Sequence, residues 1–153
     1  MKLSPCLFIY SSSARLYSSR NNMHTTIPLS LAVLVSVGII VIGCFYLTSP
    51  QRILGGFGLK PPAPDPDTQA WLRLKGIRDV ASGLAVLTLM LTSDSRTVGI
   101  VLLVFAIIPF GDMSNILASG GRRVTAFPVH GLTCAVMLFA GLLFDTCHLS
   151  GNG

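Results

Sequence analysis

The stretch IPLSLAVLVSVGIIVIGCFYL, residues Ile27–Leu47, decides the fold of this chain. It contains no Asp, Glu, Lys or Arg. It is also long enough to cross a bilayer, because a helix needs roughly 20 apolar residues to span a hydrocarbon core of about 30 Å. A stretch of this kind predicts a transmembrane helix, and the chain is therefore expected to be an integral membrane protein.

Three further apolar blocks follow, at about 74–91, 98–117 and 127–144. Of the 153 residues, 51% are hydrophobic and only 11% are charged, too few ionic groups to cover a water-soluble globule. The connections between the last three blocks are short, which makes neighbouring helices antiparallel. The sequence predicts an all-α, polytopic membrane protein. We expect a four-helix transmembrane bundle over residues 27–147, with tails at 1–26 and 148–153.

The segment before the first block, residues 1–26, is basic and rich in serine and has no acidic residue. Three interpretations stay open: a transit peptide, a disordered basic tail, or a chain whose true start is Met23. The run Val41–Cys44 resembles a lipoprotein cleavage box, but three more apolar blocks follow it. We therefore interpret the first block as a retained membrane anchor.

The basic residues lie beside the apolar blocks, which is the pattern expected at a phospholipid surface. The net charge of +5 therefore indicates the lipid bilayer as a partner and does not favour nucleic acid. Lys and Arg are denser in the first connection, counted with the helix entry that holds Arg73 and Lys75, and in the third connection than in the second. By the positive-inside rule, the first and third connections are expected in the cytosol. The basic segment 1–26 argues for the opposite orientation.

The cysteines, at positions 6, 44, 134 and 147, show neither paired spacing nor a neighbouring histidine cluster. The sequence therefore indicates no zinc site and no disulfide framework. It also shows no signature of a nucleotide, haem, flavin or metal site, so we expect no cofactor.

Ionisable side chains at membrane depth are costly and therefore point to function. The apolar blocks contain few of them: Arg78 and Asp79 near the start of the second block, Asp112 with the polar Asn115 near the end of the third, and His130 near the start of the fourth. In an antiparallel bundle these three places lie at one side of the membrane. The spacing of three residues puts Asp112 and Asn115 on a shared helix face. The sequence predicts a polar pocket between the second, third and fourth helices.

Two backbone features support this pocket. Pro109 removes a hydrogen bond just before Asp112, and such breaks are tolerated in membranes mainly where protein or a cavity covers them, so we expect a kink that turns Asp112 inward. Gly76 and Gly83 lie seven residues apart on nearly one face of the second helix. They predict close approach of a neighbouring helix.

Two carboxylates, an imidazole and a guanidinium around an apolar cavity can serve as general acid and base. Asp79, Asp112 and His130 are therefore candidate catalytic residues, and Arg78 and Asn115 are candidate substrate-binding residues, with no metal. Such a site suits isomerisation, cyclisation or dehydration of a lipophilic substrate. The structural alternative is that Arg78 and Asp79 pair with Asp112 or Asn115 and simply lock the helices together.

Four motifs, Gly56–Leu59, Leu74–Asp79, Ile108–Asp112 and His130-Gly131, resemble a family of small fungal four-helix membrane proteins of unknown function. The resemblance covers roughly residues 28–145. Members of that family often lie near natural-product biosynthetic genes, so the resemblance implies an accessory role in such a pathway without indicating the reaction. A looser likeness, at the level of the fold alone, is to the DoxX-like membrane proteins.

Three functions follow as hypotheses. The first is a cofactor-free acid and base enzyme that acts on a lipophilic intermediate, such as a polyketide or a terpenoid, beside other biosynthetic enzymes. The second is a transport or proton-relay component that uses the same Asp and His residues. The third is a noncatalytic scaffold that anchors soluble enzymes through its basic loops. We expect the endoplasmic reticulum to be the home membrane.

Overall fold

The structure is a computed structural model of the chain, and it describes the backbone of residues 5–151 and the side chains of residues 26–146. Every regular element in the described part is helical, which confirms the predicted all-α class. The elements are α1 (Pro5–Thr48), α2 (Pro50–Phe57), α3 (Pro66–Thr92), α4 (Ser95–Phe105), α5 (Ile107–Ala118), α6 (Arg123–Thr125), the π-helical turn η1 (Ala126–Gly131) and α7 (Leu132–Gly151).

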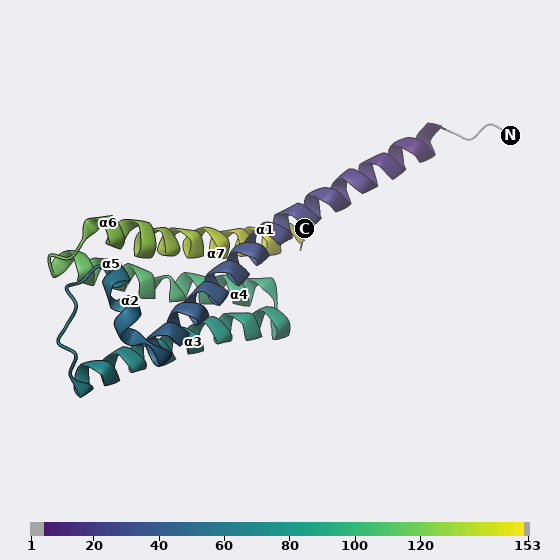
Figure 1. The fold of residues 1–153 in the computed structure, drawn as a ribbon. Coiled ribbons are helices and arrows are strands. Elements are labelled where there is room, and N and C mark those ends of the chain that lie inside the picture. The colour runs from purple at the N-terminus through teal and green to yellow at the C-terminus, as the bar shows by residue number, and fades with distance from the viewer. Residues whose placement is uncertain (1–4, 152–153) are drawn as a thin grey trace.

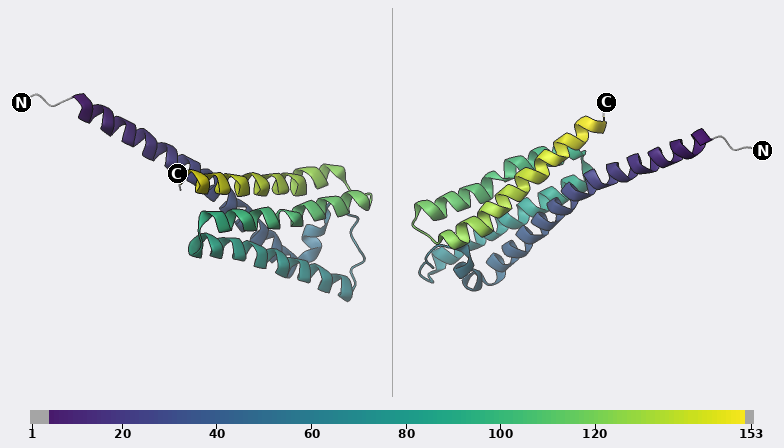
Figure 2. Two further views of the ribbon diagram at one scale, coloured as in Figure 1. Left: turned by 180° about the vertical axis from the view of Figure 1, so that it is seen from behind. Right: turned by 90° about the horizontal axis from the view of Figure 1, so that it is seen from above.

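The long helices form two packed pairs (Figure 1). α1 packs along α3 and α4 packs along α7, while contacts between α1 and α7 join the pairs. α3 and α4 meet beside the turn at residues 93–94, and from there α3 diverges from the line of α4 and α5 (Figures 1 and 2). The core lies where the pairs meet, among Ala32, Val86, Leu102 and Met137.

Three stretches in the described part of the chain are long and apolar enough to cross a membrane: Thr26–Thr48, Ser95–Ala118 and Arg123–Thr146. They contain the predicted spans 27–47, 98–117 and 127–144, so the chain is a membrane protein, as expected. The predicted count of four spans is not confirmed. The block at 74–91 lies inside α3, where three charged side chains interrupt the apolar sequence.

The first and last helices extend beyond the predicted limits of the bundle. α1 begins at Pro5, so this helix includes most of the segment 1–26 that was expected as a tail. α7 continues to Gly151, through most of the predicted tail 148–153. The remaining residues of these two tails, 1–4 and 152–153, lie outside the described residues.

The expected break at Pro109 is present. α4 ends at Phe105 and α5 begins at Ile107, so the helix is interrupted one turn before the proline. The physical reason is that Pro109 has no N–H and that its ring displaces the carbonyl of Phe105, four residues earlier. Asp112, three residues after the proline, lines a partly open cavity of the bundle.

The close helix approach predicted at Gly76 and Gly83 is also confirmed, and the neighbouring helix is α1. A Cβ atom on Gly76 would lie 2.8 Å from the carbonyl oxygen of Gly43, and one on Gly83 would lie 2.7 Å from that of Ser36. Because no side chain separates them, the two backbones touch. This contact fixes the position of the first half of α3, which carries the charged residues.

Aspartates close the N-terminal ends of α3 and α4. Asp65 accepts a hydrogen bond of 2.8 Å from the backbone N–H of Thr68, and Asp94 accepts one of 3.0 Å from that of Thr97. Each satisfies an N–H that has no partner within the helix. The same threonine hydrogen bonds lower the pKa of both aspartate carboxyls from the ordinary value of 3.8.

Candidate functional site

A partly open cavity of about 90 Å³ lies between the helices of the bundle. Most of its wall is apolar and comes from α1, α3, α4 and α7, including Val35, Ile39, Val86, Leu102, Phe105 and Met137. Each water needs about 10–15 Å³ by this measure, so the space holds several waters or one end of a small organic molecule. Ile42 and Val129 line the cavity and are also exposed on the outside, so it is continuous with the apolar surface.

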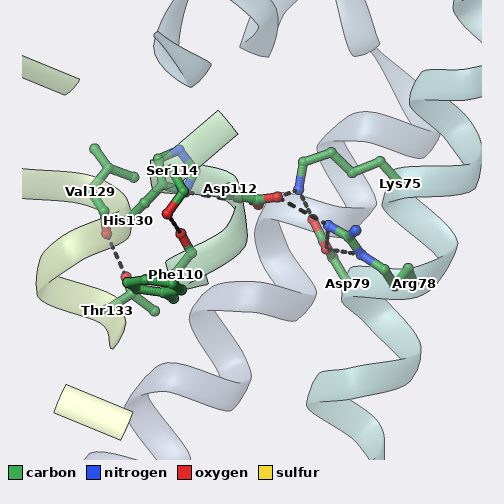
Figure 3. Close-up of polar contacts among 9 residues, drawn as sticks. All are labelled: Lys75, Arg78, Asp79, Phe110, Asp112, Ser114, Val129, His130 and Thr133. Atoms are coloured by element: carbon green, nitrogen blue, oxygen red, sulfur yellow. Dashed lines mark hydrogen bonds and ion pairs between the residues drawn. The ribbon is translucent and has the colours of Figure 1, made fainter. Parts of the chain in front are cut away.

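The first half of α3 supplies the basic residues and one acid of the site (Figure 3). Asp79 is only 6% exposed and accepts a hydrogen bond of 2.7 Å from Lys75 Nζ, one turn earlier on the same helix. Arg78 Nη2 lies 3.4 Å from the other carboxylate oxygen of Asp79, but its side chain is 47% exposed. Lys75 is therefore the inner partner of Asp79 and Arg78 the outer one.

Asp112 comes from α5 and lies between His130 and the charged residues of α3 (Figure 3). One carboxylate oxygen lies 3.5 Å from Lys75 Nζ and 3.9 Å from His130 Nδ1, and the other lies 3.7 Å from Arg78 Nη2. All three distances exceed the roughly 2.7–2.9 Å of a direct charge-assisted hydrogen bond. Asp112 thus has positively charged groups nearby, but none of them makes a direct hydrogen bond to its carboxylate oxygens.

His130 lies in the π-helical turn η1 and is 9% exposed. Single π-helical turns recur at functional sites, and this one contains Pro128. The Nδ1 atom of His130 faces Asp112, while its Nε2 atom has no hydrogen-bond partner among the described residues. The ring of Phe57, from α2, meets the imidazole edge to face at 5.0 Å between centroids, and the Phe57 backbone carbonyl lies near the imidazole.

Ser36 of α1 is the second polar side chain on the cavity wall that has no partner. It is 1% exposed, and its Oγ makes no hydrogen bond to any described residue. Two other polar side chains on the same wall are satisfied: the Ser82 hydroxyl donates to the carbonyl of Arg78, and the Thr133 hydroxyl donates to that of Val129. Because a buried polar group without a partner costs free energy, Ser36 calls for an explanation.

Lys75 is a charged residue of the site that the sequence analysis did not identify. It was interpreted as one of the flanking basic residues that set orientation, yet its Nζ contacts both carboxylates and lies 5.1 Å from the ring centre of Tyr46 and 5.3 Å from that of Phe57. The spacing of four residues between Lys75 and Asp79 was the available signal, because side chains at that spacing meet on a helix.

The structure brings together Arg78, Asp79, Asp112 and His130, as the antiparallel arrangement predicted. Asn115 does not join them: its side chain is exposed, and it does not line the cavity. A separation of three residues turns a side chain by about 60° from the starting direction, and at the cavity rim this rotation is enough to point Asn115 outward.

No group of three His, Cys, Asp or Glu side chains that would hold a metal ion occurs within residues 26–146. Of the cysteines with described side chains, Cys44 is exposed and Cys134 is buried, and both are free. The chemistry available in the cavity is therefore that of carboxylate, imidazole, ammonium and hydroxyl groups.

Comparison with protein families matches residues 36–144 to the model described as Domain of unknown function (DUF4267). No curated protein and no solved structure shows a significant match to the chain. The matched range contains the whole cluster, from Ser36 through Lys75, Asp79 and Asp112 to His130. The expectation of a family of unknown function is confirmed.

Proposed function

Because the chain belongs to the family of Domain of unknown function (DUF4267), its activity has to be inferred from its own residues, and we propose a four-span membrane enzyme that transfers protons on a lipophilic substrate. In this proposal α3 is the fourth span. Its charged side chains are tolerated at membrane depth because they meet carboxylates, aromatic rings and the cavity.

The contrast between the two carboxylates carries the proposal. Asp79 is bonded to Lys75 at 2.7 Å and also lies beside Arg78, so its charge is compensated. Asp112 lines the cavity, and every cation near it stands beyond direct hydrogen-bonding distance. We therefore assign Asp112 as the general base. Asp79, expected from the sequence as catalytic, takes the role of holding Lys75 in place.

His130 completes the proposed proton path. With its proton on Nε2, the imidazole gives that proton to one atom of the substrate while Asp112 takes a proton from another and passes it to Nδ1, 3.9 Å away, as the two groups close up during reaction. The imidazole is then protonated on Nδ1, and proton exchange with water restores the proton on Nε2 before the next turnover. The sum of these transfers is an isomerisation, and delivery to a hydroxyl oxygen gives dehydration or starts a cyclisation. No cofactor enters these steps.

The proposed setting is the biosynthesis of a lipophilic fungal natural product, such as a polyketide or a terpenoid, at the endoplasmic reticulum. The apolar cavity wall supports the lipophilic substrate. The biosynthetic context rests on the resemblance of the four sequence motifs to a family found near such genes. In that context Arg78, half exposed beside Asp112, is the proposed contact for a polar group of the substrate at the rim.

One observation favours a second function, a proton relay or transport component. Asp79, Lys75, Asp112 and His130 form an uninterrupted series of ionisable groups with successive separations of 2.7, 3.5 and 3.9 Å. Such series occur in membrane pumps and transporters. The two functions differ in what happens to the lipophilic molecule, because an enzyme changes its structure and a transporter changes its location.

The test is Asp112→Asn in cells that lack the native protein, with lipophilic metabolites measured by mass spectrometry in cells and medium. We expect the final product to fall by about 100-fold or more and its precursor to accumulate, since removing a general base costs roughly 10²–10⁴ in rate. Asp145→Asn is the matched control, because that carboxylate is 50% exposed and pairs only loosely with Arg96, at 4.0 Å.

Both variants are compared at equal protein levels. Unchanged totals with product displaced between cells and medium would favour transport over catalysis. A wild-type metabolite profile with Asp112→Asn would contradict the acid and base role altogether. The ion pairs would then serve only to hold the helices together. Unaltered metabolites in cells that lack the protein would contradict both functions.

A further inference from the structure

We propose that a groove at the connection between α5 and α6 binds the headgroup of an anionic phospholipid from the surrounding leaflet. The groove is partly open and has a volume of about 430 Å³. The residues that line it are Leu117, Gly120, Gly121, Arg123 and Phe127. None of them lines the cavity that holds Asp112 and His130, so the proposal does not depend on the proposed function.

The groove lies at the level of the lipid headgroups. One stretch that is long and apolar enough to cross a membrane ends at Ala118, and another begins at Arg123. The connection between them, residues 119–122, therefore lies where the hydrocarbon core meets the headgroup region. Figure 1 shows this connection at the same end of the bundle as α2. A lipid of the leaflet reaches the groove without entering the protein.

The charge of the groove is not compensated within the described part of the chain. No ion pair among residues 26–146 includes Arg122 or Arg123, and both side chains are exposed. A phosphate diester supplies the missing negative charge. The guanidinium of Arg123 suits it, because planar N–H groups can bind two phosphate oxygens at once. Arg122, the preceding residue, adds attraction for an anionic lipid.

The apolar side of the groove fits the rest of the lipid. Phe127 is 54% exposed and its neighbour Val124 is 73% exposed, and large apolar side chains gain free energy by leaving water. An acyl chain whose phosphate lies at Arg123 passes along Phe127 and Leu117 toward the hydrocarbon core. A soluble phosphate compound has no chain that would use these contacts. The combination therefore favours a lipid as the ligand.

The backbone holds the groove in shape before a ligand arrives. Gly120 has a φ of 68°, which lets the chain turn tightly after α5. The N–H of Gly121 donates to the carbonyl of Ile116 at 2.8 Å. The N–H of Arg122 donates to the carbonyl of Gly58, also at 2.8 Å. Binding therefore orders little more than an arginine side chain, and its cost in conformational entropy is small.

Binding is measured by photo-crosslinking, with the full chain in phosphatidylcholine nanodiscs. The probe is a trace of phosphatidylserine with a diazirine in its acyl chain, and peptide mass spectrometry gives the labelled fraction of residues 117–127. Unlabelled phosphatidylserine, phosphatidate and diacylglycerol are the competitors in the membrane. Glycerophosphoserine, the same headgroup without chains, is the competitor in the buffer. We expect the two anionic lipids to compete, and diacylglycerol and glycerophosphoserine to leave labelling unchanged.

Arg123→Gln and Arg73→Gln are the decisive pair of variants. Each removes one exposed arginine that makes no ion pair among the described residues, but Arg73 lies on α3 and does not line the groove. We expect Arg123→Gln to raise the half-competing fraction of phosphatidylserine about fivefold, the value of one arginine at an anionic lipid surface. Arg73→Gln should change it by less than twofold. Neither side chain has a partner to lose, so the Tm of both variants should equal that of the native chain.

Three results would overturn the proposal. Diacylglycerol that competes as well as phosphatidylserine would show that the chains alone explain binding. Competition by glycerophosphoserine would assign the groove to a soluble phosphate compound instead of a lipid. Equal loss of labelling in the two arginine variants would show that the lipid responds to the net charge of this end of the bundle and not to the groove.

Discussion

Replacing Lys75 by methionine is expected to destabilise the protein by about 3–5 kcal/mol, the usual cost of removing one partner from a buried ion pair. Asp79 is 8% exposed in its side chain and depends on the 2.7 Å contact with Lys75 for compensation. Methionine keeps the length and apolar stem of lysine, so packing between the rings of Tyr46 and Phe57 survives. The measurement is reversible unfolding in mixed micelles, followed by circular dichroism.

Arg78→Met is the matched control for this substitution. Arg78 also lies beside Asp79, at 3.4 Å, but its side chain is 47% exposed at the rim of the cavity, and an exposed ion pair contributes only about 0–1 kcal/mol. The double variant Lys75→Met with Asp79→Asn removes both charges and should recover most of the lost stability. A double variant as unstable as Lys75→Met alone would show that Lys75 stabilises through the aromatic rings instead of through Asp79.

The fold was predictable where its causes are local in sequence. Uninterrupted apolar blocks identify spans without knowledge of the neighbours. A proline inside a block predicts a break, as found between α4 and α5, and glycines seven residues apart predict a helix contact, as found along α3. The partner of that contact was not predictable, because Gly43 lies in another block and only the assembled bundle brings it to Gly76.

The sequence was enough to predict which charged residues form the site. It was not enough to predict which polar side chains have hydrogen-bond partners. Asp79, Asp112 and His130 stand out because charge is rare in apolar blocks, and antiparallel connections bring them to one side. Ser36 gave no such signal, since serine is common in membrane helices and normally bonds to its own backbone. Lys75 lay close enough to the loop to be interpreted as a flanking charge. The sequence around His130 also shows no periodic pattern that would indicate a π-helical turn.

The contact between α1 and α3 yields the second large effect: Gly43→Leu should destabilise the bundle by about 3 kcal/mol or more, at or above the upper end of overpacking costs. A Cβ on Gly43 would lie 2.8 Å from the carbonyl oxygen of Gly76 and 2.9 Å from the backbone nitrogen of Val80. Backbone atoms cannot rotate away, so α3 has to move. Since α3 carries Lys75 and Asp79, the site should come apart together with the helix pair.

Gly38→Leu makes the same change on the same helix where nothing lies within 4 Å of the added Cβ. That variant should be at least as stable as the native chain, because glycine costs about 1 kcal/mol of helix propensity relative to better helix formers. Both variants are compared by unfolding in mixed micelles and by the metabolite profile of cells that lack the native protein. We expect the final product to be lost with Gly43→Leu and kept with Gly38→Leu. Equal stability of the two would mean that α1 and α3 do not touch at Gly43, and a cavity walled by both helices would then be wrong.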